Sequence, residues 1–547
     1  MMKTRNNRYM PLVLALCVVA GIIIGTFYAN HFAGGRLSII NQGGNRINSL
    51  LNIINDQYVD AVDIDSLVDE AIPQILSDLD PHSVYISAED VQATNDELAG
   101  SFSGVGIEFV IRKDTIHVQG VISNGPAERA GILAGDKIVS IDGKPFVGKE
   151  VTNQEAMHRL KGPKGTKVTV GVKRYGTEKV ETFTITRADI PQKSIIATYM
   201  LDSKTGYIRV RNFGDKTYAE MLVALAQLQQ YGFNNLVIDL RDNTGGYMEA
   251  AVQMVNEFLP KDRLIVYMEG RKQPRYDYKS DGRGTYQTMP LVVLINEGSA
   301  SASEIFAGAI QDNDRGMIIG RRSFGKGLVQ QQMDFANGSA IRLTVARYYT
   351  PSGRCIQKPY TTGEGSEYDK DLLERYEHGE FFSQDSIKHT GKEYYTVMGR
   401  KVYGGGGITP DIFVPEDTAD VTSYYKEAAM SGLILQFAFD YTDRERNRLK
   451  EFDNVDDINN YLVSQNTVDK FVVYAEQHGL KRRNNLIKKS HKLLEQYINS
   501  RIIYNIMDEN AWMEYLNRDD EVVKKALEVF ENNAAFPQKP EPESTNE

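Results

Sequence analysis

Residues 291–311 read LVVLINEGSASASEIFAGAIQ, and this stretch decides the fold. Its first five residues are uniformly apolar, which is typical of a strand buried on both faces of a sheet. The small and polar residues Asn296–Ala300 indicate a loop, and Ser301–Gln311 has the composition of a helix. The stretch therefore predicts one strand, loop and helix of a layered α/β core.

The same pattern occurs earlier in the chain. Leu236–Leu240 predicts a second buried strand, followed by the loop Asn243–Gly246 and a helix over Tyr247–Phe258. In α/β sheets of this kind, sites form at the carboxyl ends of the strands. Because both loops lie at such ends, we expect their residues to face one site.

Ser301 is placed for nucleophilic attack at the start of its predicted helix. The N–H groups of a first helical turn have no partners within the helix, so they and the helix dipole can stabilise an oxyanion. An alternative needs no catalysis: Ser301 and Glu304 have the spacing of a helix capping box.

A nucleophilic serine needs a base. Each of the eight histidines, His82 included, stands in a structural or solvated setting. Lys326 is the better candidate, because glycines on both sides let its backbone approach closely and burial would lower its pKa. Gln330 would share its face in an extended chain and could hold the amine. The alternative is an exposed lysine in a glycine turn.

Composition excludes several function classes. The net charge is -10, and basic residues are interleaved with acids, which argues against a nucleic-acid partner. Cys17 lies in an apolar run and Cys355 lies far away in a polar segment, so the sequence predicts neither a disulfide nor a zinc site. The glycine loops at 162–166 and 325–327 lack the spacing of a phosphate-binding loop.

The N-terminus predicts a membrane anchor. Lys3, Arg5 and Arg8 precede an uncharged run over Tyr9–Ala29, which is long enough to cross a bilayer as a helix. Because a basic flank stays in the cytoplasm, the chain is expected to be a single-pass protein of the inner (cytoplasmic) membrane with a periplasmic catalytic part. A cleaved signal peptide is the alternative.

The remaining segments complete the predicted domain organisation. The stub and anchor occupy 1–36, a helical region 37–97, short strands with glycine turns 98–188, the α/β core 189–416, a second helical region 417–537, and a disordered tail 538–547. A strand is expected over Phe102–Ile111. The helical regions are compatible with a homo-oligomer.

Several segments together resemble the C-terminal processing proteases, peptidase family S41. Ser299–Ile305 followed by Phe324–Gly327 is similar to the family's central motif, with the family's spacing between Ser301 and Lys326. The resemblance covers about 40–416. Its other segments, in the family's order, are Leu79–Ser83, Asp239–Gly246, Ala346–Gly353 and Gly407–Asp411.

The resemblance implies a ClpP/crotonase-like layered α/β serine protease core with an inserted PDZ domain over 98–188. It implies Ser301 as nucleophile, Lys326 as general base and Gln330 as the residue that orients the lysine. It also implies an oxyanion hole from the N–H of Ala302 and of either Gly245 or Gly246. Glu304 and Asp312 would support the site, and no metal or organic cofactor is implied.

The PDZ resemblance lies in the segment around Gly104. There the loop and strand would hold a peptide's terminal carboxylate on backbone N–H groups while the peptide adds as a strand. The residues concerned are Val105, Gly106, Ile107, Glu108 and Phe109. The helix Thr152–Leu160 would form the other wall, and Lys161 stands where some family members place a basic residue linking this domain to the catalytic site.

The sequence therefore predicts a serine endopeptidase that cleaves extracytoplasmic proteins near free C-termini. Two other hypotheses differ in class. The first is a PDZ scaffold with a silent core, against which the presence of Ser301, Lys326 and Gln330 speaks. The second is acyl transfer on a small thioester, a chemistry in which the PDZ-like segment has no role.

Overall fold

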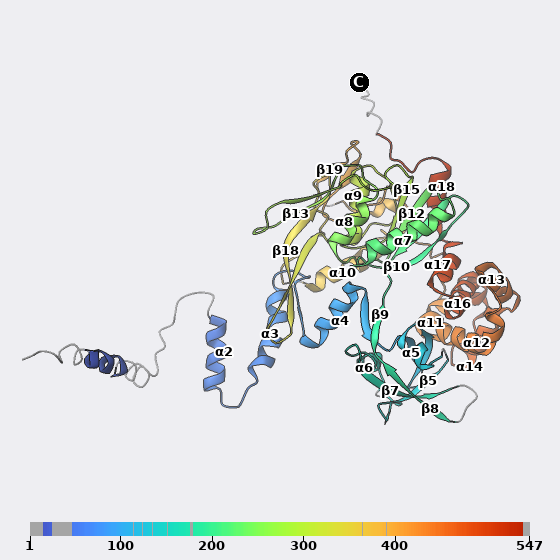
Figure 1. The fold of residues 1–547 in the computed structure, drawn as a ribbon. Coiled ribbons are helices and arrows are strands. Elements are labelled where there is room, and N and C mark those ends of the chain that lie inside the picture. The colour runs from blue at the N-terminus through green and yellow to red at the C-terminus, as the bar shows by residue number, and fades with distance from the viewer. Residues whose placement is uncertain are drawn as a thin grey trace, which may run out of the picture. The chain divides into compact units, whose positions relative to one another are not determined.

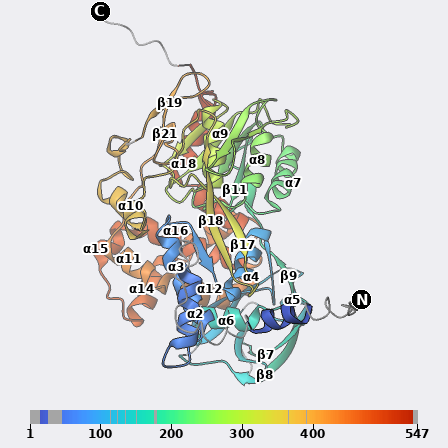
Figure 2. The same cartoon turned by 90° about the vertical axis from the view of Figure 1, so that its left-hand side faces the viewer.

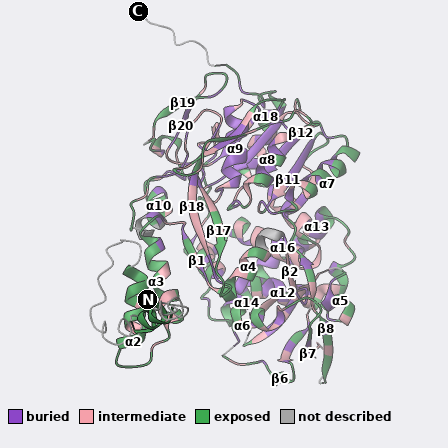
Figure 3. Cartoon of the chain, turned by 60° about the vertical axis from the view of Figure 1, so that its left-hand side comes forward, coloured by how far each residue is buried: buried purple, intermediate pink, exposed green. Residues whose placement is uncertain are grey.

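A computed structural model describes residues 15–24, 46–112, 114–122, 124–133, 135–149, 151–174, 179–363, 365–389 and 391–539. The chain divides into two compact units, residues 1–74 and 75–547. The first contains a helical segment at 15–24, α2 (Arg46–Gln57) and most of α3 (Ile64–Ser77). Every residue of α2 is at least partly exposed, and most of the helix is green in Figure 3.

The predicted anchor and tail fall largely outside the described residues. Of the run Tyr9–Ala29, only 15–24 is described, and it is helical. None of the helices in the described part is both long and apolar enough to span a membrane. Of the predicted tail, only 538 and 539 are described.

The core of the second unit is a six-stranded sheet. Its strand order is β10-β11-β12-β15-β16-β21, with β10 antiparallel to β11 and the other pairs parallel. The strands are β10 (Ile195–Met200), β11 (Thr205–Val210), β12 (Asn235–Asp239), β15 (Leu291–Ile295), β16 (Met317–Gly320) and β21 (Ile412–Phe413). All residues of β15 are buried, in agreement with its apolar sequence.

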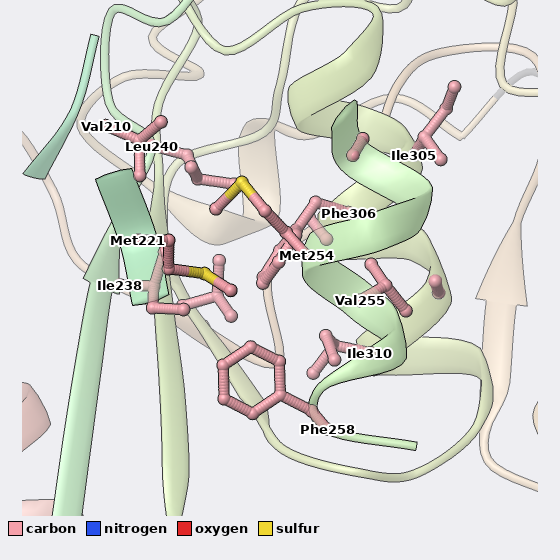
Figure 4. Close-up of a cluster of buried hydrophobic side chains, with 14 of the residues drawn as sticks. Val210, Met221, Ile238, Leu240, Met254, Val255, Phe258, Ile305, Phe306 and Ile310 are labelled. Atoms are coloured by element: carbon pink, nitrogen blue, oxygen red, sulfur yellow. The ribbon is translucent and has the colours of Figure 1, made fainter. Parts of the chain in front are cut away.

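Helices α7 (Thr217–Gln230), α8 (Met248–Asn256) and α9 (Ala302–Asp312) cover one face of this sheet. Figure 2 shows them grouped in the upper part of the molecule. Their apolar side chains meet those of the strands in one cluster, which includes Met254 of α8 and in which Met221 of α7 lies near Ile238 of β12 (Figure 4). This packing fixes the start of α9, where Ser301 lies.

The opposite face is covered by the end of the chain. Helices α17 (Glu509–Asn517) and α18 (Glu521–Glu531) pack on β10, β15 and β16 (Figure 1). The segment predicted as one helical region over 417–537 therefore contributes its last two helices to the core sheet. The preceding helices have a core of their own: α11 (Ser423–Met430), α12 (Leu433–Leu449), α13 (Val455–Ser464), α14 (Thr467–Gln477), α15 (Asn484–Lys489) and α16 (His491–Ile506).

A second sheet carries the long hairpin that follows Lys326. Its order is β1-β18-β13-β14, and β17 pairs with β18. The strands are β1 (Val84–Ile86), β13 (Leu264–Glu269), β14 (Tyr276–Lys279), β17 (Leu328–Asp334) and β18 (Ala340–Tyr349). The polar excursion after it contains α10 (Gly365–Glu377), the 3₁₀ helix Gln384–Ser386, β19 (Glu393–Tyr395) and β20 (Lys401–Tyr403).

The inserted domain follows α4 (Ala88–Ala99) and forms a sheet of order β3-β4-β5-β7-β8, with β6 (Lys144–Pro145) beside β5. Its elements are β3 (Ile107–Arg112), β4 (Thr115–Val121), α5 (Pro126–Ala130), β5 (Lys137–Ile141), α6 (Asn153–Leu160), β7 (Lys167–Lys173) and β8 (Val180–Thr186). Strand β2 (Ser101–Gly104) pairs with β9 (Ala188–Pro191), so the chain enters and leaves the domain side by side.

The expectation of one strand over Phe102–Ile111 is wrong. The chain breaks between β2 and β3 at Val105 and Gly106. Gly106 has a φ of 77°, and a Cβ at this position would lie 2.9 Å from the side chain of Ile190. The left-handed turn therefore separates two strands that belong to different sheets.

Candidate active site

Ser301 occupies a strained turn between β15 and α9. It is the N-cap residue of α9, with φ 54° and ψ -113°. A residue other than glycine rarely adopts a positive φ, and such strain concentrates at functional sites, where a sharp strand-to-helix turn exposes a nucleophile. The turn is anchored on the carbonyl of Asn243, which accepts the N–H of Ala300 at 2.9 Å and the hydroxyl of Ser303 at 2.8 Å.

One buried carboxylate holds the backbones of both candidate catalytic residues. Glu304 Oε2 accepts the N–H of Ser301 at 2.8 Å and the N–H of Lys326 at 2.9 Å. Its Oε1 accepts the hydroxyl of Ser323 at 2.5 Å and the N–H of Gly325 at 2.7 Å. Burial raises the pKa of Glu304 to about 7, although these hydrogen bonds favour its charged form. The contact between Glu304 and the N–H of Ser301 is the capping-box contact that the sequence analysis gave as a non-catalytic alternative. The same carboxylate also binds the backbone of Lys326.

Lys326 is half-buried at the entrance to β17, so the alternative of an exposed lysine is wrong. Burial and the nearby cation of Arg342 lower its pKa, whereas Glu304 and Asp80 act in the opposite direction. The buried hydroxyl of Tyr348 donates to the Lys326 carbonyl at 2.5 Å and lies 3.1 Å from the carbonyl of Ser301. The surroundings therefore lower the pKa of the Lys326 amine, and the contacts of its N–H and carbonyl fix its backbone.

Ser301 and Lys326 line one cavity of about 540 Å³. Gly245, Gly246 and Ala302 lie on its wall, as does Gln330. The apolar part of the wall comes from Met248, Ile305, Leu328 and Val329. The structure thus brings together every residue that the sequence assigned to catalysis and to the oxyanion hole.

The two glycines differ in what their N–H groups do. The N–H of Gly245 donates to Asn243 Oδ1 at 2.9 Å. Within the described residues, the N–H groups of Gly246 and Ala302 have no acceptor, and both residues face the cavity. A Cβ on Gly245 would lie 2.7 Å from the Cβ of Ser301, so this glycine serves close packing against the serine.

Gln330 does not follow Lys326 in simple alternation. The β17–β18 pairing has a bulge between Val329 and Gln330, which interrupts the period-two argument. The side-chain amide of Gln330 donates to the carbonyl of His82 at 3.3 Å. This contact uses the nitrogen and leaves the amide oxygen as an acceptor.

Three groups around Lys326 were not connected to it by the sequence: Asp80, His82 and Arg342. Burial and the cations of Lys326 and Lys358 lower the pKa of His82 to about 4, while Asp80 acts in the opposite direction. Its Nε2 lies 2.8 Å from the hydroxyl of Tyr368, which agrees with a structural role. The segment Leu79–Ser83 was one of those that resemble the S41 peptidases, but its sequence did not predict that it lies near Lys326.

The residues predicted for peptide binding lie at one edge of the inserted domain. Strand β3 pairs with β4, and no strand of the described residues pairs with its other edge. Ile107 and Phe109 pack toward the core that contains Ala156 and Leu160 of α6. Glu108 instead contacts the hydroxyl of Tyr504 in α16, at 3.4 Å, so its side chain is engaged with the C-terminal helices.

A second cavity of about 630 Å³ continues the first toward the inserted domain. Both cavities are lined by Thr94, Asn212 and Thr244. The second also contacts Phe102 and Lys161, whose Nζ lies 4.8 Å from the centre of the Phe102 ring. In the described part of the chain, no group of three or more His, Cys, Asp or Glu residues is placed to hold a metal.

Comparison with known proteins agrees with this architecture. Residues 204–367 match the model of peptidase family S41, 103–186 match the PDZ domain, and 424–508 match a family of unknown function, DUF8443. A carboxy-terminal-processing protease of Bartonella bacilliformis is 40% identical over 319 residues, which cover 57% of this chain and 72% of that protein. Carboxy-terminal processing protease CtpB of Bacillus subtilis is 34% identical, over 57% of this chain and 65% of that protein.

Among solved structures, the photosystem II D1 C-terminal processing protease is similar at 26% sequence identity. The alignment covers 69% of this chain and 88% of that one, with a TM-score of 0.37.

Proposed function

This chain belongs to peptidase family S41, the carboxy-terminal processing peptidases of serine type, and we propose that it cleaves proteins with a Ser301–Lys326 dyad. The observation that carries the proposal is that both residues line one cavity while one carboxylate, that of Glu304, fixes both of their backbones. A nucleophile and its base need such fixed mutual geometry.

In the proposed mechanism, Ser301 Oγ attacks the scissile carbonyl while the neutral Nζ of Lys326 takes the hydroxyl proton. The N–H groups of Ala302 and Gly246 stabilise the oxyanion. Lys326 then gives the proton to the leaving amine, and the acyl-enzyme forms. Water, deprotonated by the same amine, hydrolyses the ester and restores Ser301.

The proposed role of Gln330 is to orient the amine. Its amide nitrogen donates to the carbonyl of His82, so the amide oxygen is the group that remains to accept a hydrogen bond from Lys326. An amide oxygen accepts a hydrogen bond from an ammonium or amine. Gln330 therefore acts through Lys326 and has no contact with the reacting carbonyl in this scheme.

The PDZ domain is proposed to bind the free C-terminus of the substrate protein. The open edge of β3 can take a peptide as an added strand. The cavity that continues from Ser301 past Phe102 and Lys161 supports a path for the same chain to the catalytic site. An extracytoplasmic location and an anchor are supported by the sequence of residues 3–29 alone.

The dyad is tested with Ser301→Ala and Lys326→Ala on an unfolded substrate with a free C-terminus. Each is expected to lower kcat by about 10⁴-fold or more, because dyad members act as a unit. Ser464→Ala and Lys272→Ala, at exposed positions, are the matched controls. Melting temperature and circular dichroism report whether the variants fold.

Each outcome discriminates between mechanisms. Undiminished cleavage by Ser301→Ala excludes this serine as the nucleophile. Full activity of Lys326→Ala, together with loss of activity in His82→Ala, would transfer the base role to the histidine. Labelling of Ser301 by a serine-reactive phosphonate, abolished in Lys326→Ala, separates an active peptidase from a silent scaffold.

A further inference from the structure

Arg342 lines the catalytic cavity without a carboxylate partner. It lies in β18, opposite Gln332 of β17 and Val84 of β1. Its guanidinium contacts the amide oxygen of Gln332 at 3.4 Å, a weak bond to a neutral group. Within the described residues, no carboxylate oxygen lies within 4.0 Å of it.

Three other half-buried or buried arginines of the same unit pair with a carboxylate, whereas the buried Arg315 donates to backbone carbonyls. Arg354 contacts Asp312 at 2.7 Å, Arg322 contacts Glu380 at 2.6 Å, and Arg400 contacts Asp411 at 2.5 Å. A cation that is partly removed from water is stabilised by a nearby anion or by hydrogen-bond acceptors, because desolvation disfavours its charge. Arg342 has the Gln332 contact alone among the hydrogen bonds of its guanidinium within the described residues, and it lines the same cavity as Ser301.

The other polar groups on that wall are mostly neutral. They include the amides of Asn95, Asn212, Gln330 and Gln332. Glu249, in the first turn of α8, is the acidic residue among those that line the cavity, and it is exposed. Beside Lys326, the cavity therefore presents the cation of Arg342, without a carboxylate partner, among neutral hydrogen-bonding groups.

We propose that Arg342 is a specificity-determining residue that binds a carboxylate of the peptide substrate close to the scissile bond. The proposal rests on the Ser301–Lys326 site described above. A guanidinium matches a carboxylate through two parallel N–H···O bonds. The carboxylate comes either from an Asp or Glu side chain or from the peptide's own C-terminus, and the two sources are separated by the experiment below.

The same contact couples recognition to the catalytic base. The cation of Arg342 lowers the pKa of Lys326, whereas Glu304 and Asp80 raise it; neutral His82 also faces the lysine. A substrate carboxylate bound to Arg342 offsets its charge and so raises the pKa of Lys326. The acid limb of kcat is therefore expected at higher pH for an acidic peptide than for its neutral counterpart.

The test uses one peptide core in matched forms. Glu replaces Gln at each position within four residues of the cleaved bond, and each peptide is made with a free and an amidated C-terminus. The ratio of kcat/KM for the preferred acidic form to that of its neutral form is measured in the wild type, Arg342→Gln and Arg342→Lys. Arg347→Gln, on the same strand, exposed and outside the cavity, is the matched control.

The wild type is expected to prefer one acidic form by about tenfold, the size of a charge-assisted hydrogen bond. Arg342→Gln brings that ratio to about one, and Arg342→Lys retains part of it because the charge remains but the paired geometry is lost. Arg347→Gln leaves the ratio as in the wild type. If the free terminus carries the preference, the source is the α-carboxylate; if an internal Glu carries it, the source is a side chain.

An equal fall of kcat/KM for all peptides in Arg342→Gln would overturn the proposal, as would a wild-type ratio of one for every form. An acid limb that stays in place in Arg342→Gln would overturn the coupling to Lys326. Either failure is distinct from failure of the dyad, because Ser301→Ala would still be inactive on every peptide.

Discussion

Arg241 Nη1 lies 2.7 Å from Asp520 Oδ2, which joins the segment before the loop Asn243–Gly246 to the N-cap of α18. Arg241 also contacts the buried carboxylate of Asp239 at 2.6 Å. The loop that begins at these residues ends at Gly245 and Gly246, beside Ser301. The C-terminal helix α18 therefore supports the proposed oxyanion hole from the far side of the sheet.

Asp520→Asn tests this support. Asp520 is also the N-cap of α18, where it accepts the N–H groups of Val522 and Val523 at 2.9 and 3.0 Å. Asparagine is an equally good N-cap, so the change removes the ion pair and keeps the cap. We expect the free energy of unfolding to fall by about 1–3 kcal/mol and kcat to fall more than KM changes.

Asp508→Asn is its control. Asp508 caps α17 in the same way, accepting the N–H of Ala511 at 2.8 Å. It should leave both kcat and the melting temperature close to those of the wild type. If the two variants behave alike, the ion pair with Arg241 contributes nothing beyond capping.

Tyr348→Phe removes the hydroxyl that joins the carbonyls of Lys326 and Ser301. The carbonyl of Lys326 in this part-buried contact loses its donor, which should cost about 1–3 kcal/mol of stability. Because the hydroxyl acts on the backbones of the dyad, we expect kcat to fall with KM nearly unchanged. Steady-state kinetics with one peptide substrate measures the split.

Tyr349→Phe provides the comparison for Tyr348→Phe. Tyr349 is the next residue and stacks on Tyr267, with ring centres 4.7 Å apart, a contact that phenylalanine preserves. A similar loss of kcat in both variants would show that the Tyr348 hydroxyl has no specific role in the dyad.

Glu304 makes stability depend on pH in a defined direction. Burial raises its pKa to about 7 in the folded chain, above the ordinary value of 4.5. The folded state thus holds the proton more tightly, so the contribution to stability is fully present below pH 4.5 and is lost as pH rises through about 7. The loss is at most about 1.4 kcal/mol per pH unit.

Glu304→Gln removes this titration. The melting temperature, measured from pH 5 to 7.5 in a Ser301→Ala background that prevents self-cleavage, should fall less steeply with pH than in Ser301→Ala alone. Its activity should be low, since a glutamine side chain has one oxygen acceptor for the N–H groups of Ser301 and Lys326 and the hydroxyl of Ser323. Parallel pH profiles would mean that Glu304 does not titrate in this range.

Much of the site could be predicted from the sequence because its signals are local. The uniformly apolar run Leu291–Ile295 fixed a buried strand, and the small residues before Ser301 indicated a turn into a helix. The family resemblance to S41 peptidases with a PDZ domain is confirmed. Lys326 and Gln330 line the same cavity as Ser301, in agreement with the prediction that they share one site. Their catalytic roles stay predictions until tested.

What the sequence did not reveal depends on contacts between distant segments. The bulge before Gln330 arises from pairing with β18 and leaves no mark in the local pattern. The contact of Asp520 with Arg241 joins residues far apart in sequence, and the amphipathic pattern of α18 does not say which sheet it covers. Nothing in the sequence around Arg342 distinguishes it from the other arginines. Only the fold brings its cation close enough to Lys326 to lower the pKa of that lysine.

Gly245→Ala separates the packing role of this glycine from its conformational one. Gly245 has a φ of 104°, and an added Cβ would lie 2.7 Å from the Ser301 Cβ and 2.8 Å from the carbonyl oxygen of Ala300. Gly232 also has a positive φ, 72°, but a Cβ there meets nothing within 4 Å. Both substitutions cost backbone strain of about 1–3 kcal/mol, yet only the first displaces the nucleophile.

We therefore expect Gly245→Ala to abolish cleavage and labelling of Ser301 while its circular dichroism stays native, and Gly232→Ala to lose some stability and keep its kcat. A Gly245→Ala variant with normal kcat would show that the turn at Ser301 can shift without harm. The close approach of the two loops, on which the proposed oxyanion hole depends, would then be of no consequence for the reaction.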